Sequence, residues 1–380
     1  MRDLCFTDCV ELVGTSCPPF DGQRQYVSTG AVDVDHISEG DVEVVEYSTK
    51  PSRANLVAEC GDILFAKMQG TKKTLQINST LVNNVYSTGF CAVRAKTSVL
   101  TSRCLYHLLT SETFLDQKDR NCSGATQKAI TNAALSKITI NLPDINLQDG
   151  IADQLDRIAS VISMRQQELQ KLDDLIKARF VEMFGDPRSN PFGFEKRMLK
   201  DTCKVITGNT PSRAIPEYYG DFVEWIKTDN IVSGLLNPTK AAESLSEKGL
   251  EAGRTVDSGA ILMACIAGSI ASIGRVCVTD RKVAFNQQIN AVVPKQYDIF
   301  FLYSLIQMSK EYLVEDINMA LKGILSKSKL EEKEFIVPPM ELQEQFADFV
   351  KQVDKSKVAV QAALDKAQLL FDSLMQEYFG

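Results

Sequence analysis

Two long segments of the chain carry apolar side chains at helical spacing. In residues 147–185 the apolar positions, which step by three, four or seven, are Ile151, Leu155, Ile158, Ile162, Leu169, Leu172, Ile176 and Met183. In residues 339–380 they are Phe346, Val350, Val353, Val360, Leu364, Ala367, Phe371, Leu374 and Tyr378. Such a stripe is typical of a coiled coil. We predict two helices, each about 55 Å long, that pair antiparallel along these stripes; ordinary packing inside a helix bundle is the alternative.

The rest of the chain has a different pattern. Residues 1–146 and 186–338 contain short apolar or β-branched runs, such as 41–45, 61–65 and 275–278, which are broken by Gly, Asn, Ser and Pro. Helical patterns occur near 101–118 and 299–316. Short strands mixed with a few helices predict α+β units with loops long enough for recognition.

The chain repeats itself. A shift of 195 residues aligns Leu147–Gly185 with Leu342–Gly380 without a gap, and Gln148 with Gln343 is one of the identical pairs. The runs that begin at Gly61 and at Gly259 also resemble each other. This is a tandem duplication of the order globular unit, helix, globular unit, helix.

Composition narrows the class of protein. Hydrophobic residues make up 44% and charged residues 24%, which is enough for buried cores, and no apolar run reaches the ~20 residues of a membrane span. The start, MRDLCFTDCV, lacks the pattern of a secretory signal. The 10 cysteines are scattered without a CxxC pair, so we expect reduced, mostly buried thiols in a cytoplasmic protein and no metal site.

The net charge of −7 hides local basic stretches. Residues 63–111, 120–143 and 317–330 contain no Asp or Glu, although each contains Lys or Arg. Local basic surfaces on an acidic protein suit a phosphate backbone. Ordinary solvated faces are the alternative explanation.

Signatures of catalysis are not found. The sequence has neither GxxxxGK[ST] nor HExxH, and we expect structural roles for its two histidines, His36 and His107. We therefore expect no catalytic residues in this chain.

With these features in place, the chain resembles the specificity subunits of type I restriction–modification systems. The motifs that carry the resemblance are Ile206-Thr-Gly-Asn-Thr-Pro-Ser, Trp225-Ile-Lys-Thr-Asp-Asn-Ile, the Gly-Asp-Ile-Leu and Gly-Ala-Ile-Leu turns, Gly124-Ala-Thr-Gln-Lys-Ala-Ile, Val337-Pro-Pro-Met-Glu-Leu-Gln-Glu-Gln, and the helix ends Met-Phe-Gly and Tyr-Phe-Gly. The first unit departs from the pattern, because Gly14-Thr-Ser-Cys-Pro-Pro matches Thr-Pro-Ser only loosely.

The resemblance implies a domain order and a set of partners. It makes 1–146 and 186–338 two target-recognition domains, 147–185 a central spacer helix and 339–380 a C-terminal spacer helix, with pseudo-two-fold symmetry. It implies a non-catalytic subunit that reads a bipartite, asymmetric site in double-stranded DNA, with half-sites about 34 Å or a multiple of it apart. DNA methyltransferase subunits, two of them, would carry S-adenosylmethionine and modify adenine at N6. Restriction subunits, where present, would use ATP and Mg. No cofactor is expected in this chain itself.

Candidate DNA-binding residues follow from side-chain chemistry, because Arg, Asn and Gln read base edges and Lys contacts phosphate. In the first domain they are Lys67, Gln69, Lys72, Lys73, Gln127 and Lys128. In the second domain they are Arg213, Lys227, Arg275, Asn286, Gln287, Lys322 and Lys327.

Two other classes of protein remain open at this point. A coiled-coil scaffold that joins two protein-binding domains fits the same architecture. An acidic mimic of DNA would explain the net charge but needs dense carboxylates, which residues 63–111 lack.

Overall fold

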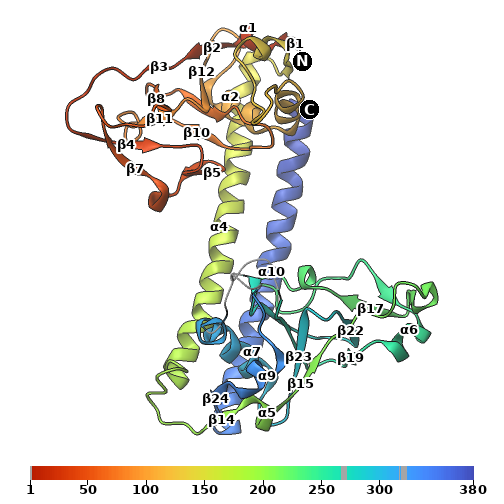
Figure 1. Ribbon diagram of the computed structural model, residues 1–380. Helices are drawn as coiled ribbons and strands as arrows, with labels where there is room; N and C mark the ends of the chain where they lie inside the picture. The colour runs from red at the N-terminus through yellow and green to blue at the C-terminus, as the bar shows by residue number, and fades with distance from the viewer. Residues whose placement is uncertain (1, 267–271, 316, 318–322) are drawn as a thin grey trace. The chain divides into compact units, whose positions relative to one another are not determined.

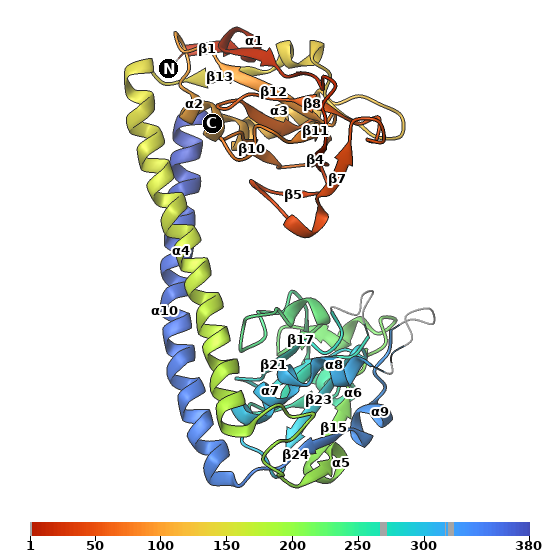
Figure 2. The same ribbon diagram turned by 90° about the vertical axis from the view of Figure 1, so that its left-hand side faces the viewer.

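We analysed a computed structural model of the chain, which describes residues 2–266, 272–315, 317 and 323–380 (Figures 1 and 2). The chain divides into two units. The first unit contains residues 1–164 and 363–380, and the second contains residues 165–362. Each unit therefore combines one globular part with one section of each of two long helices.

The first unit is built on two main sheets. Its strands are β1 Arg2–Cys5, β2 Val10–Val13, β3 Thr15–Ser16, β4 Gln23–Val27, β5 Val32–Asp33, β6 His36–Ile37, β7 Glu43–Glu46, β8 Ala54–Val57, β9 Ile63–Ala66, β10 Thr74–Gln76, β11 Val85–Ser87, β12 Phe90–Ala95 and β13 Thr139–Leu142. Its short helices are α1 Phe6–Cys9, α2 Ser102–Thr110 and α3 Glu112–Arg120, with 3-10 turns at Glu39–Asp41 and Ala133–Lys137. The sheet orders are β10-β9-β12-β2 and β3-β8-β11-β4-β7, and β1-β13 and β5-β6 form two small ribbons.

The second unit repeats this plan. Its strands are β14 Lys196–Met198, β15 Cys203–Thr207, β16 Tyr219–Gly220, β17 Val223–Ile226, β18 Ser244–Leu245, β19 Thr255–Val256, β20 Ile261–Ala264, β21 Val276–Val278, β22 Val283–Phe285, β23 Ile289–Pro294 and β24 Glu334–Ile336. Its short helices are α5 Leu199–Thr202, α6 Glu247–Ala252, α7 Ile299–Met308, α8 Lys310–Val314 and α9 Lys327–Glu332, with 3-10 turns at Pro216–Tyr218 and Thr228–Asn230. The sheet orders are β15-β23-β20-β21 and β16-β18-β17-β22-β19, with a β14-β24 ribbon.

The two copies share the order of their four-stranded sheets and of four strands in the larger sheet, β8-β11-β4-β7 and β19-β22-β17-β18. They differ in the outer strand, since β3 borders β8 whereas β16 borders β18. Equivalent central strands also pair in the same way. β4 pairs parallel with β11, with Tyr26 opposite Val85, and β17 pairs parallel with β22, with Trp225 opposite Ala284. The fully buried strands β9 and β20 follow turns in which Gly61 has φ +96° and Gly259 has φ +88°. This left-handed conformation favours glycine, which explains the repeated Gly-Asp-Ile-Leu and Gly-Ala-Ile-Leu motifs.

Two helices of 40 residues each, α4 (Ile145–Phe184) and α10 (Met340–Phe379), contribute to both units and run side by side within each (Figures 1 and 2). The start of α4 packs with the end of α10 in the first unit, and the end of α4 packs with the start of α10 in the second. This arrangement confirms the predicted antiparallel pair. Pseudo-two-fold symmetry stays a prediction.

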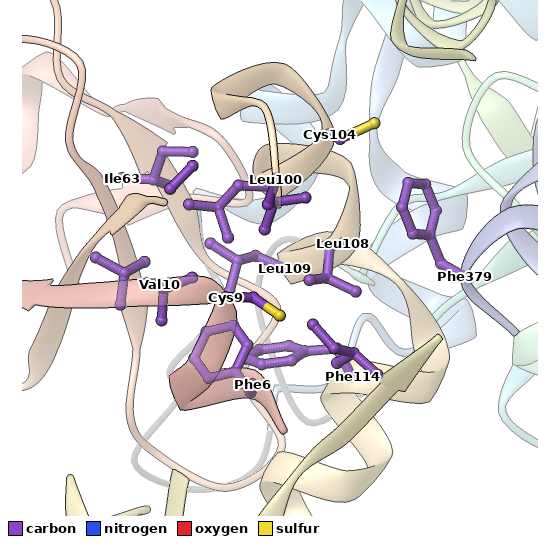
Figure 3. Close-up of a cluster of buried hydrophobic side chains, with 14 of the residues drawn as sticks. Phe6, Cys9, Val10, Ile63, Leu100, Cys104, Leu108, Leu109, Phe114 and Phe379 are labelled. Carbon is purple, nitrogen blue, oxygen red and sulfur yellow. The ribbon is translucent and has the colours of Figure 1, made fainter. Parts of the chain in front are cut away.

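Aromatic side chains close the core of each unit. In the first, Phe6 packs on Phe114 with ring centroids 5.1 Å apart, and Phe379 of α10 reaches the same cluster (Figure 3). In the second, Phe184 of α4 packs on Phe301 of α7 at 4.8 Å and on Phe346 of α10 at 5.6 Å. The helix pair is thus part of each domain's hydrophobic core.

A buried glutamine joins each globular part to the helix that follows it. The Gln148 side chain accepts a hydrogen bond from Thr101 N–H at 2.8 Å and donates to the carbonyls of Val99 and Pro143 at 2.9 and 3.1 Å. Gln343 accepts from Asp298 N–H at 3.0 Å and donates to the Pro338 carbonyl at 2.8 Å. We call these two side chains the glutamine latches. Thr101 and Asp298 also cap α2 and α7, so each latch fixes the start of a domain helix against a long helix.

The predicted α+β class is confirmed, with two similar units and two long helices. The helical patterns near 101–118 and 299–316 correspond to α2 with α3 and to α7 with α8. Seven of the ten cysteines are buried and all ten are free, as expected for structural thiols. His107 is also structural: its Nε2 lies 2.8 Å from Asp156 Oδ1, and its ring packs on Phe371.

Candidate nucleic-acid interface

Two loops of the first unit meet where the sequence placed six candidate residues. We call residues 67–73 and 121–130 the first loop pair. Gln69 N–H donates to the Lys128 carbonyl at 3.0 Å, and Ile130 N–H donates to the Lys67 carbonyl at 2.9 Å. A bridge between Met68 and Ala129 joins the same two loops. Residues about 60 positions apart in sequence thus form one surface.

The six candidates differ in how free their side chains are. Gln69, Lys72, Gln127 and Lys128 are exposed, whereas Lys67 and Lys73 are half-buried. Lys73 Nζ donates to the Thr29 carbonyl at 2.8 Å, and Gln127 Nε2 lies 2.8 Å from Met68 Sδ. Lys72 has neither a hydrogen bond nor an ion pair with the part of the chain that the structure describes. Its ammonium is therefore available to a phosphate.

A buried lysine that we did not predict is hydrogen-bonded to the backbone of this loop pair. Lys118 of α3 is 0% exposed, and its Nζ donates to the carbonyls of Met68 and Thr71 at 3.0 and 2.9 Å. Asp119 Oδ2 accepts from Gly70 N–H at 2.9 Å, while Asp119 Oδ1 lies 3.1 Å from the Lys118 ammonium. Gly70 has φ +73°, as a tight turn requires. The ion pair holds the turn that presents Gln69 and Lys72.

The second unit contains the same loop pair. Leu325 N–H donates to the Cys265 carbonyl at 2.9 Å, and Ile266 bridges Ile324, as Ile130 with Lys67 and Met68 with Ala129 do in the first unit. The candidate Lys322 belongs to this loop pair by sequence but lies outside the described residues.

Other candidates of the second unit gather at a different loop. We call residues 208–213, together with Trp225 and Lys227, the second loop cluster. Gly208 lies so close to β22 that an added Cβ would be 2.1 Å from the Asn286 carbonyl oxygen. Trp225 Nε1 donates to the Asn209 carbonyl at 3.3 Å. The Gly-Asn-Thr-Pro-Ser motif therefore folds against the β17–β22 pair because only glycine fits at its start.

Arg213 and Lys227 form a cation–aromatic stack in this cluster. The Arg213 guanidinium lies 4.3 Å from the ring centre of Tyr219 and 5.2 Å from that of Trp225, and Lys227 Nζ lies 5.1 Å from that of Trp225. Both cations also pair with Glu243. The hydrogen bonds from Lys227 and then Arg213 hold the pKa of Glu243 below its usual value. Glu243 thus orients the two cations and offsets part of their charge.

The remaining candidates have more varied surroundings. Gln287 is exposed and accepts a hydrogen bond from Thr210 of the second loop cluster. Asn286 is 6% exposed, and its amide bonds with Gln288 to close the turn after β22. Arg275 donates to the carbonyls of Ser272 and Thr228. Lys327 is exposed at the start of α9, 3.5 Å from Glu331.

Sequence reasoning also missed a cation–aromatic group in the first unit. The Arg24 guanidinium of β4 lies 4.5 Å from the ring centre of Phe20, which packs edge-on against Tyr47 at 5.7 Å. Arg24 is on the strand that corresponds to β17, so it parallels the Arg213 and Lys227 stack. The sequence pattern did not single out Arg24, because Phe20 and Tyr47 come together with it only in the folded unit.

Two further features of the structure concern other classes of function. The helices described here include none that is long and apolar enough to span a membrane. No group of three or more His, Cys, Asp or Glu side chains is placed to hold a metal ion within the described ranges.

Comparisons with known proteins agree with this architecture. Residues 35–174 and 191–367 each match the family described as type I restriction modification DNA specificity domain. The type I restriction enzyme HindI specificity subunit of Haemophilus influenzae is 23% identical over 72% of this chain and 76% of its own length. The MjaIX specificity subunit of Methanocaldococcus jannaschii is 27% identical over 43% of this chain and 38% of its own length.

Solved structures show the same fold. A chain from a structure of a type I restriction–modification system superimposes with a TM-score of 0.56 and 20% identity, covering 99% of this chain and 97% of that one. The S subunit of a type I system from M. genitalium gives a TM-score of 0.59 at 12% identity, covering 100% and 96%. The two matched domains span most of the sequence, and the chain belongs to the family of type I restriction–modification DNA specificity subunits.

Proposed function

We propose that each unit reads one half of a bipartite, asymmetric site in double-stranded DNA. The observation that carries this proposal is that both units share the order of their central strands and the glutamine latch, while the residues at their exposed loops differ. Different side chains on the same scaffold specify different bases. Membership of the family favours this role over a scaffold that only joins protein-binding domains.

We assign the contacts by chemistry. In the first unit, Gln69 and Gln127 are the base-reading side chains, because each is an exposed amide on the first loop pair. Lys72, Lys73 and Lys128 are the phosphate contacts beside them, with Lys67 at the edge. In the second unit, Arg213, Lys227 and Gln287 contact DNA from the second loop cluster. The proposal extends to Arg275, Asn286, Lys322 and Lys327, which complete the set chosen from sequence.

A double charge reversal tests the first loop pair. Lys72→Glu with Lys73→Glu in the complete methyltransferase complex is expected to weaken DNA binding, because two phosphate contacts are lost. The slope of log affinity against log salt should fall by about 2, at about 0.9 per phosphate contact. The matched control is Lys240→Glu with Lys282→Glu, two exposed lysines outside both candidate surfaces. Equal affinity and slope in the test variant, or equal losses in the control, would remove the first loop pair from the interface.

The partners follow from the same proposal. We infer that two DNA methyltransferase subunits assemble with this chain and supply S-adenosylmethionine, with N6 of adenine as the methylated atom. Restriction subunits join in systems that cleave DNA, and they supply the site for ATP and Mg. The target adenine is flipped out of the duplex into the methyltransferase subunit.

Exposed apolar residues on the long helices support docking there. Val358 is 63% exposed, and the adjacent Leu369 and Leu370 are 72% and 51% exposed, all on α10. Neighbouring exposed apolar side chains are typical of an interaction surface. Val358→Glu and Leu369→Glu, made separately, should each reduce co-purification of the methyltransferase subunit at least tenfold. Lys355→Glu, one turn from Val358 and already polar, is the control and should retain it. Full assembly of both test variants would place the docking surface elsewhere.

A further inference from the structure

The second unit contains a pocket where α7 meets the long helices. Its volume is about 290 Å³, close to the lower end of small-molecule sites. Apolar side chains from all three helices line it, among them Ile176 and Phe180 of α4, Tyr303 of α7 and Val350 of α10. The candidate DNA-binding residue Arg275 is on its lining, but none of the other candidates is.

In the first unit, larger side chains occupy the positions of two residues that line this pocket. Thr101 and Asp298, which cap α2 and α7 and bond to the two latches, are equivalent positions of the two units. Counting from them, His107 of α2 is equivalent to Ser304 of α7. In the repeat of the long helices, Phe371 of α10 is equivalent to Ile176 of α4. In the first unit the His107 and Phe371 rings pack together with centroids 6.4 Å apart. The second unit has the smaller Ser304 and Ile176 at the same two positions, and both line the pocket.

Two polar groups in the pocket lack partners. Ser304 is 3% exposed, and its Oγ has no hydrogen-bond partner among the described residues. Asp354 of α10 also lines the pocket and makes neither a hydrogen bond nor an ion pair with any described residue. Burial raises the pKa of the Asp354 carboxyl, because water is partly removed from it, although Lys357 acts in the opposite direction. A buried polar group without a partner, such as the Ser304 hydroxyl, is rare in proteins and calls for an explanation. The Asp354 carboxyl is half-buried on the same lining.

The cations that line the pocket, in contrast, all have partners. Lys357 Nζ lies 2.7 Å from Asp173 and donates to the Gly234 carbonyl at 3.0 Å. Lys177 pairs with Asp174, Arg275 donates to two backbone carbonyls, and Lys310 also has an interaction. Asp354 and Ser304 are therefore lining groups whose hydrogen-bonding capacity is not used by any described residue.

We propose that this pocket binds a small organic cation, with an apolar body against Ile176, Phe180 and Val350 and an ammonium or amidinium group at Asp354 and Ser304. A charged donor placed on an otherwise unpaired carboxylate forms a strong, charge-assisted hydrogen bond. The volume is suited to a single ring with a short amine-bearing arm. The pocket shares only Arg275 with the candidate DNA-binding residues, and the proposal uses Asp354 and Ser304, so it does not depend on DNA recognition.

Three probes with the same ring and different charges test the proposal. Benzylamine, benzyl alcohol and benzoate are titrated into the full chain, and the ¹³C-methyl signals of Ile176, Met308 and Val350 are followed by NMR. Saturable shifts are expected with benzylamine, at an affinity about tenfold above that of benzyl alcohol. Benzoate is expected to be weaker than both. Absence of saturable shifts with benzylamine, or a preference for benzoate, would overturn the proposal.

Two variants locate the site. Asp354→Asn, which keeps the shape of the side chain, should abolish the preference for benzylamine over benzyl alcohol, whereas Glu344→Gln, an exposed position on the same helix, should keep it. Ser304→His with Ile176→Phe introduces the side chains that the first unit has at these positions, which should fill the pocket and abolish binding of all three probes. The buried Trp225 is the only tryptophan, so an unchanged fluorescence spectrum shows that the second unit is folded in each variant. A preference that survives Asp354→Asn, or binding that survives the filled variant, would refute the assignment.

Discussion

The glutamine latch of the second unit gives the sharpest test of how each domain is attached to its helix. Gln343 is 1% exposed, and its amide satisfies the Asp298 N–H and the Pro338 carbonyl. Gln343→Ala removes both partners at once. A buried backbone group left unsatisfied costs about 1–3 kcal/mol. Two such groups are left, and water that enters the space can bond to them in part. We therefore expect the unfolding free energy of the second unit to fall by about 2–4 kcal/mol.

Trp225 makes this loss measurable in the second unit alone. It is the only tryptophan of the chain, lies in the second unit and is 3% exposed, so its fluorescence reports unfolding of that unit. For a urea dependence of about 3 kcal/mol per M, the midpoint of the fluorescence transition should fall by about 1 M. The corresponding change in the first unit, Gln148→Ala, should shift the overall transition followed by circular dichroism more than it shifts the Trp225 signal.

The control for helix content is Gln352→Ala, an exposed glutamine on the same helix. It should change the unfolding free energy by less than about 0.5 kcal/mol. The reasoning is refuted if Gln343→Ala leaves the Trp225 midpoint where it is in the unchanged protein. It is equally refuted if Gln352→Ala lowers the midpoint as much, because the loss would then come from the helix and not from the latch.

Three further predictions concern single positions. Burial lowers the pKa of His107, against the opposing effect of Asp156. As the pH falls, the unfolded chain therefore takes up a proton on this imidazole before the folded chain does. Stability should thus be constant above pH about 6.5 and fall below it, by up to about 1.4 kcal/mol per pH unit, and His107→Gln should remove this fall in urea titrations at pH 5–7. Cys60 is the exposed thiol, whereas burial raises the pKa of Cys91 to about 11 and of Cys265 to about 12, so Ellman's reagent should modify Cys60 first and Cys60→Ser should abolish the fast phase. Gly208→Ala should lower the Trp225 midpoint by about 1 M because its Cβ would meet the Asn286 carbonyl, whereas Gly150→Ala, with nothing within 4 Å, should raise the stability of the chain by about 0.5–1 kcal/mol.

The architecture was predictable because it depends on sequence patterns that occur in both halves of the chain. The spacing of apolar residues such as Ile151 and Phe346 predicted two helices and their seam, and the gapless repeat predicted two equivalent units. The identity of Gln148 with Gln343 was visible as part of that repeat. Its physical reason was not visible, because the partners Thr101 and Asp298 lie about 45 residues earlier in the chain.

The candidate surfaces were only partly predictable. Acid-free stretches led to the loops 67–73 and 121–130, which the fold brings together. They could not show that Lys73 is held by the Thr29 carbonyl or that Asn286 closes its own turn, since both depend on strands that approach from elsewhere. Lys118 was overlooked because a lysine followed by an aspartate on a helix resembles a solvated surface, although here the pair is buried under a turn.

The central claim is that this chain directs methylation to one bipartite DNA sequence. The most direct measurement is to co-express it with its methyltransferase subunit in a host free of DNA methylation and to map N6-methyladenine across the host genome. We predict methylation confined to a single motif made of two different half-sites separated by a spacer of fixed length. Methylation without a sequence motif, or none at all from an assembled complex, would contradict the account.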